Sequence, residues 1–84
     1  MNDKKVFINN IDKLHTTEMG IGRIKRNIRL DIADVDVVEY CKSKLLDSKC
    51  FIYREGKNWY CEIEAIRITV NAYSYTIITA QLAG

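Results

Sequence analysis

The spacing of hydrophobic residues changes near residue 48 and divides the chain into two parts. In the first part, apolar residues recur at the intervals typical of amphipathic helices. The pattern predicts a helix over residues 3–14, a second beginning after Thr16 or Thr17, and a third that Asp31 or Asp34 caps and that ends at Asp47. Threonine is a favourable N-cap residue, and an acidic residue in the first turn suits the helix dipole. The expected apolar stripes are Phe7, Ile11 and Leu14, then Ile21, Ile24 and Ile28, then Val38, Cys41 and Leu45.

The second part alternates between apolar and polar residues, as a half-buried strand does. It predicts four strands, over residues 50–54, 59–64, 66–71 and 75–80, with Gly56 in the first turn. Helices that precede a run of strands indicate an α+β protein. Because the links are short, we expect an antiparallel sheet in the order 1-2-3-4. The prediction is a single domain over residues 1–84, with two to three N-terminal helices packed on one face of a four-stranded sheet.

The composition supports a core but limits the classes of protein. The chain has 84 residues, 48% of them hydrophobic, and is too short for a dinucleotide-binding fold or an eight-unit barrel. Its three cysteines form no C-x-x-C pair and it has one histidine, so we expect no metal site and no cofactor. Each cysteine lies in an apolar run, which favours a buried thiol in a cytoplasmic protein. No apolar stretch is long enough for a signal peptide or a membrane span, so no membrane contact is expected.

Positive charge is concentrated near the N-terminus. The net charge is only +2, but the first 30 residues hold seven basic and three acidic side chains, a local excess of four. Arg23, Arg26 and Arg29 belong to the second predicted helix. Such a helix either follows a phosphate backbone or is simply a solvated surface.

A second group of polar residues is expected on the exposed side of the sheet. Tyr60, Glu62 and Glu64 alternate along one strand, and a neighbouring strand presents Arg67, Thr69 and Asn71. Together with His15, a carboxylate and an arginine are the groups that RNA cleavage without a metal requires: a base, an acid and a stabiliser of phosphorane charge. The alternative interpretation is a solvated face with a cross-strand Glu–Arg pair, and a histidine that fixes the turn between two helices.

Tyrosines add a further candidate surface. Tyr60 and Tyr73 are expected on the polar side of the sheet. There they would stack on bases or anchor a protein interface. Exposed tyrosines of a sheet also occur without any function.

Three phrases of the sequence together resemble a known family. They are D-K-L-H-T-T-E-M-G at 12–20, G-K-N-W-Y at 56–60 and T-V-N-A-Y-S-Y-T-I-I-T-A at 69–80. They resemble DUF3781, a family of small bacterial proteins of unknown function, and the resemblance implies no activity. It implies a histidine after the third phrase, where this chain has Gln81. If that histidine is an acid or base, this member lacks it. The layout of helices and sheet is also similar to ribonucleases of the barnase, colicin and RelE types, a likeness of architecture alone.

Three hypotheses about function follow. The first is a small bacterial or mobile-element protein that acts by contact with a protein or nucleoprotein partner, with RNA contact, including a phage-type inhibitor of a host defence complex such as CRISPR. The second is a metal-independent ribonuclease that uses His15, Glu62 and Arg67. The third is an assembly subunit that forms a homodimer through the edge of the fourth strand. Under the first hypothesis, the binding residues are Arg23, Arg26, Arg29, Tyr60, Thr69, Asn71 and Tyr73.

Overall fold

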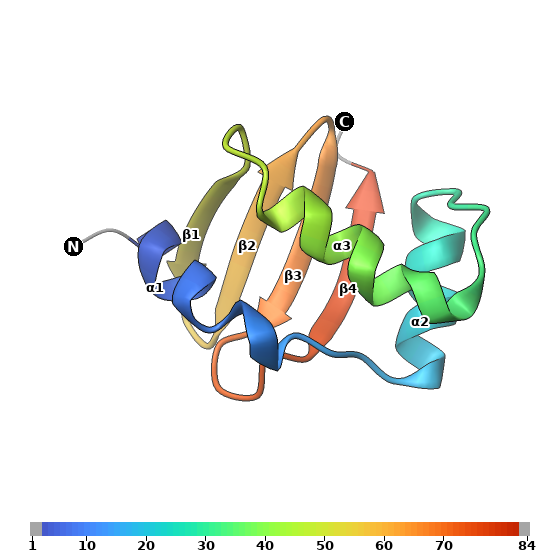
Figure 1. Ribbon diagram of the computed structural model, residues 1–84, viewed down its shortest axis with the longest axis horizontal. Helices are drawn as coiled ribbons and strands as arrows, with labels where there is room; N and C mark the ends of the chain where they lie inside the picture. The colour runs from blue at the N-terminus through green and yellow to red at the C-terminus, as the bar shows by residue number, and fades with distance from the viewer. Residues whose placement is uncertain (1–2, 83–84) are drawn as a thin grey trace.

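The computed structural model describes residues 3–82, and its elements follow the predicted order of helices before strands (Figure 1). The helices are α1 (Asp3–Asn9), α2 (Glu18–Asn27) and α3 (Val37–Leu45), with short 3-10 helices η1 (Ile11–Lys13) and η2 (Asp34–Asp36). The strands are β1 (Phe51–Glu55), β2 (Asn58–Ile63), β3 (Ile66–Asn71) and β4 (Ile77–Leu82). The strands form one antiparallel sheet in the order β1-β2-β3-β4. The predicted α+β class and sheet order are confirmed.

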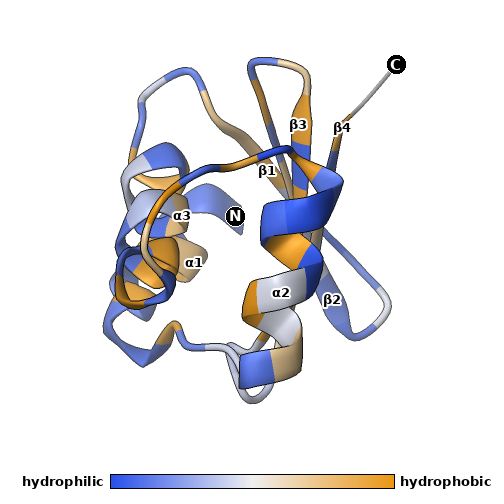
Figure 2. Ribbon diagram, turned by 90° about the vertical axis from the view of Figure 1, so that its right-hand side faces the viewer, coloured by the Kyte–Doolittle hydropathy of each residue, from blue (hydrophilic) through white to orange (hydrophobic). Residues whose placement is uncertain are grey.

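The helices are distributed unequally around the sheet. Figure 2 shows α1 and α3 on one side of it, and α2 alongside the outer strand β4. Within residues 3–82, no helix covers the opposite side of the sheet. Lys4 connects the N-terminal helix to the link between α3 and β1: its Nζ donates to the carbonyls of Asp47, Ser48 and Cys50 at 2.8–3.1 Å.

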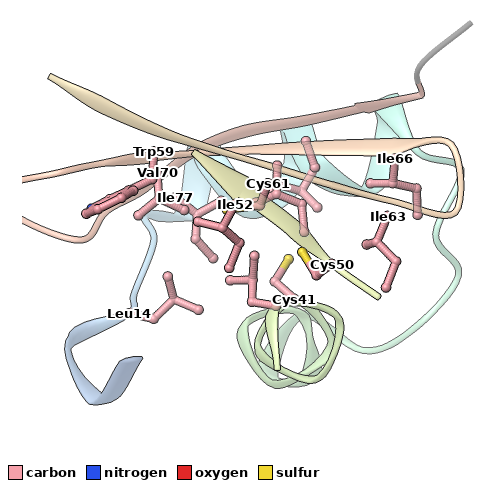
Figure 3. Close-up of a cluster of buried hydrophobic side chains, with 14 of the residues drawn as sticks. Leu14, Cys41, Cys50, Ile52, Trp59, Cys61, Ile63, Ile66, Val70 and Ile77 are labelled. Carbon is pink, nitrogen blue, oxygen red and sulfur yellow. The ribbon is translucent and has the colours of Figure 1, made fainter. Parts of the chain in front are cut away.

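The hydrophobic core lies between the sheet and the two covering helices (Figure 3). Ile52, Cys61, Ile68 and Ala80 form one row across the four strands and are at most 5% exposed. From α1, the Phe7 ring meets the rings of Trp59 and Tyr75, with centroids 5.6 Å apart in both cases. From α3, the fully buried residues are Val37, Cys41 and Leu45. Val37 therefore takes the place that we expected for Val38, which is only partly buried.

The prediction of one helix over residues 3–14 is wrong. The α-helix ends at Asn9, and η1 follows. At the break, Asn10 has φ −113° and ψ 13°, and its amide donates to the Val6 carbonyl at 3.0 Å. Asparagine side chains compete for backbone groups in this way, which makes them poor residues for the interior of a helix.

Other boundaries also differ from the prediction, by one residue at either end of β1 and β2 and by more at α3 and β4. Neither Asp31 nor Asp34 caps α3, and Asp34 instead pairs with Lys25 of α2 at 2.9 Å. The fourth strand begins at Ile77 rather than Tyr75, because Tyr75 has a positive φ of 61° and ends the preceding turn. Its ring turns inward and is 5% exposed.

Candidate functional site

One side of the sheet is left uncovered by the helices of residues 3–82. Because Trp59, Cys61 and Ile63 point into the core, the alternating residues of each strand point outward. We call this surface the open face. Two of its rows across the sheet are Tyr53, Tyr60, Thr69 and Thr79, and Phe51, Glu62, Arg67 and Gln81.

A connected group of side chains occupies the middle of the open face. Arg67 Nε and Nη2 donate to Glu62 Oε2 at 3.1 and 2.9 Å, which confirms the predicted cross-strand pair. Tyr53 donates to the same oxygen at 3.2 Å. The Arg67 guanidinium also lies 5.8 Å from the centre of the Tyr60 ring. The hydrogen bond to Glu62 raises the pKa of Arg67, and desolvation with the Glu62 charge raises the pKa of Tyr53. Glu62 therefore holds an arginine and a tyrosine in fixed positions.

Three aromatic rings continue this group across the open face. Phe51 and Tyr53 have ring centres 5.3 Å apart, and Tyr53 stacks on Tyr60 at 5.6 Å with an interplanar angle of 26°. We call Phe51, Tyr53 and Tyr60 the ring strip. Phe51 is 62% exposed, which is unusual for a large apolar side chain on a strand. Sequence reasoning missed Phe51, although its spacing of two from Tyr53 indicates a shared side of the strand.

One basic residue of α2, Arg23, borders the open face. Thr17 caps this helix as predicted, because its hydroxyl accepts the Gly20 N–H at 3.0 Å. Near the other end, Asn27 donates to Thr79 of the open face at 3.2 Å. Arg23 precedes Asn27 by four residues and therefore lies on the same side of the helix. We call Arg23, Arg26 and Arg29 the basic rim. The prediction that Arg29 belongs to this helix is wrong, because α2 ends at Asn27 and Arg29 follows it with a φ of 55°. All three are exposed, and within the described residues none forms an ion pair.

His15 lies far from the Glu62–Arg67 pair. The His15 N–H donates to the Tyr75 carbonyl, and the Ile77 N–H donates to the His15 carbonyl. The His15 Nε2 atom lies 3.0 Å from Thr76 Oγ1. Arg67 pairs with Gln81, which is five residues after Thr76 in the chain. In an extended strand this separation is about 16 Å. The structure therefore joins Glu62 and Arg67 but does not assemble the three residues of the ribonuclease hypothesis. His15 instead holds the link between η1 and α2 against the sheet.

Two other candidate residues have positions different from those expected. Glu64 lies in the turn after β2 and pairs with Lys44 of α3, away from the open face. Tyr73 is 74% exposed in the turn after β3, where it packs against Arg54, 5.4 Å from its ring centre. Arg54 also lies 5.7 Å from the centre of the core ring of Trp59, so Tyr73 is at the end of the sheet rather than on the open face.

Asn71 is bonded within a turn, and Thr69 is almost completely buried. Asn71 Oδ1 accepts the backbone N–H groups of Tyr73 and Ser74, both at 2.9 Å, and so shapes the turn between β3 and β4. Thr69 lies in the middle of the open face, but it is only 8% exposed between its neighbours. Of the candidate binding residues, Tyr60 is available to a ligand on the open face, and Tyr73 and the basic rim are exposed outside it.

The outer edge of β4 is partly occupied. His15 O accepts the Ile77 N–H at 2.7 Å, Thr16 donates to the Ile77 carbonyl at 3.0 Å, and α2 packs against the strand. Ala80 of this strand is fully buried. A homodimer through this edge stays a prediction, and it would have to use the part of β4 after Ile77.

The three cysteines are buried and unpaired in disulfides. Burial raises the pKa of the Cys41 thiol to about 11 and also raises the pKa values of Cys50 and Cys61. Such thiols are protonated at neutral pH and are poor metal ligands and nucleophiles. In residues 3–82, no three His, Cys, Asp or Glu side chains are grouped as metal ligands would be. The same residues include no helix that is long and apolar enough to cross a membrane.

The fold and this site define a small α+β protein with one covered and one open sheet face, the open face carrying rings and arginine. The chain belongs to the family described as "Protein of unknown function (DUF3781)", whose model matches residues 8–81. No curated protein and no solved structure matches it.

The three phrases that resembled this family meet at one end of the molecule. His15 of the first phrase bonds to Tyr75 and Ile77 of the third, and the Ala72 N–H of the third donates to Lys57 O of the second at 2.8 Å. These phrases therefore hold the α1–α2 link and two turns of the sheet together. Gln81, where the resemblance implies histidine, lies on the open face beside Arg67.

Proposed function

We propose that this protein is a small binding module, and that it acts by holding a protein or nucleoprotein partner against the open face and the basic rim. The observation that carries the proposal is the bonded group of Tyr53, Glu62, Arg67 and Tyr60 on a sheet face that no described helix covers. An inhibitor of a host defence complex such as CRISPR is one case of such contact.

The composition of the open face supports this proposal. Tyrosine and arginine are enriched among the residues that contribute most to binding at protein interfaces. Their side chains lose rotamer freedom on binding, at a cost of about 0.5–1.5 kcal/mol each. Tyr53 and Arg67 are already held by Glu62 Oε2, so most of that cost is met during folding. Phe51 adds an apolar ring that is 62% exposed.

A photo-crosslinking experiment tests the location of the partner. Phe51 is replaced by benzoylphenylalanine in a tagged copy expressed in the native host, which adds a photoreactive group to an existing ring. The matched control carries the same group at Val35, which is 85% exposed in η2 beside α3. We expect crosslinked adducts from position 51 and none from position 35. Equal yields from both positions, or no adduct from either, would contradict the proposal.

A further inference from the structure

We infer that the ligand of the open face is single-stranded nucleic acid, with bases stacked on the ring strip and phosphates at the basic rim. This inference rests on the proposed function and assigns a chemical class to the partner.

The ring strip has the properties of a stacking platform. Its rings follow one another in a tilted stack over β1 and β2, with centres 5.3 and 5.6 Å apart, and the Arg67 guanidinium continues the stack beyond Tyr60. Every base offers a flat π-face to an aromatic ring or a guanidinium, but only when it is not paired and stacked within a duplex. The strip therefore suits an unpaired strand rather than a double helix.

Positive charge is placed where the strand would leave the rings. The row Tyr53, Tyr60, Thr69 and Thr79 crosses the sheet and reaches Asn27 of α2. Three strand spacings of about 4.8 Å make this path about 15 Å long from β1 to β4. Beyond it, Arg23 lies on the same side of α2 as Asn27, and Arg26 and Arg29 are exposed nearby in sequence. None of the three arginines forms an ion pair among the described residues. Phosphates that follow the bases across the sheet would meet these cations.

The one acidic residue in the middle of the platform does not oppose this ligand. Two bonds from Arg67 and one from Tyr53 end on Glu62 Oε2. Its charge is therefore balanced by Arg67, and its role is to hold the ring and the guanidinium in place. Glu62 acts here as a positioning residue that need not touch the nucleic acid.

The test is fluorescence anisotropy of the full chain with a labelled oligothymidylate and oligouridylate of roughly twelve nucleotides. Tyr60→Ala removes one ring and is expected to weaken binding by between about 5-fold and about 100-fold. Tyr60→Phe keeps the ring and should bind as the wild type does. Urea unfolding followed by Trp59 fluorescence shows whether each variant is folded.

Charge variants distinguish binding at the basic rim from nonspecific attraction between the nucleic acid and the net charge of the protein. Arg23→Glu is expected to weaken binding and to reduce the slope of log K against log salt by about 0.7 for each phosphate that the variant no longer neutralises. Lys13→Glu makes the same change of charge in η1 and should leave affinity and slope close to those of the wild type. Tyr60→Ala should lower affinity without changing the slope.

Several outcomes would overturn the inference. They are no binding at about 50 mM salt, tighter binding of a duplex than of the single strand, and equal losses of affinity from Arg23→Glu and Lys13→Glu. If benzoylphenylalanine at position 51 captures a protein while the oligonucleotides do not bind, the binding module stands and the nucleic-acid ligand is wrong. If position 51 captures nothing, both proposals fail.

Discussion

Replacing Asn71 with alanine separates a structural role of this residue from the binding role that the sequence suggested. Asn71 Oδ1 accepts two backbone N–H groups, from Tyr73 and Ser74, each at 2.9 Å. A neutral hydrogen bond contributes about 0.5–1.5 kcal/mol net, and these two lie near solvent, where water replaces part of the loss. We therefore expect Asn71→Ala to lower the free energy of unfolding by about 1–2 kcal/mol.

The chain provides its own probe and a matched control. Trp59 is the single tryptophan and is 3% exposed, so its fluorescence reports the opening of the core during urea unfolding. For a domain of this size, about 1–2 kcal/mol corresponds to a fall in melting temperature of roughly 4–16 °C. Asn71→Asp keeps an acceptor oxygen for the same two N–H groups and should lose much less stability.

The reasoning about the turn fails under two results. One is an alanine variant as stable as the wild type, which would mean that Oδ1 contributes nothing to the turn. The other is an aspartate variant as unstable as the alanine variant, which would mean that the acceptor oxygen is not the important group. If oligonucleotide binding by folded Asn71→Ala falls while its stability is unchanged, Asn71 is a binding residue.

Three further changes probe the junction and the core. A Cβ on Gly20 would lie 2.2 Å from Thr16 Oγ1, so Gly20→Ala should break the Thr16–Ile77 hydrogen bond and destabilise the wild type. In a Thr16→Ala background the same change should stabilise the protein, because alanine has the higher helix propensity. An effect of the same sign in both backgrounds would contradict this. Thr17→Ala should cost about 1 kcal/mol and Thr17→Ser much less, measured by urea unfolding, because only the hydroxyl caps α2. Burial raises the pKa of the Cys41 thiol from 9.0 to about 11. The contribution of the neutral thiol to the free energy of unfolding is therefore complete below pH 9 and is lost as the pH rises towards 11. We expect the unfolding free energy to fall by about 1.4 kcal/mol per pH unit more steeply in the wild type than in Cys41→Ala over that window; parallel curves would refute it.

Much of the secondary structure could be read from local patterns. The alternation through Trp59, Cys61 and Ile63 determined both the strand and the side that it buries, because a period of two is a property of extended backbone. Short links between strands determined the antiparallel order and brought Glu62 opposite Arg67. The errors were at boundaries such as Asn10 and Asp36, where one side-chain bond or its absence decides how a helix begins or ends.

The candidate site could be predicted only in part. Tyr60, Glu62 and Arg67 were expected on one face, since they follow from the register of a single hairpin. Phe51 was missed, and its partnership with Tyr53 required the whole of β1 to be aligned. Tyr73 was expected on the same face, but the turn that Asn71 shapes carries it to the end of the sheet.

The sequence by itself determined which residues form helices and strands, which sides they bury, and which neighbours in a hairpin meet. Only the tertiary structure decided that α2 lies along β4 and that His15 lies against Thr76, 61 residues away in the chain. Local periodicity carries no information about such pairs, because they form when separate elements pack into one core. For that reason His15 is separated in space from Glu62 and Arg67, although the three residue types suit RNA cleavage. For the same reason α2 and the ring strip, which are distant in the sequence, meet at the open face.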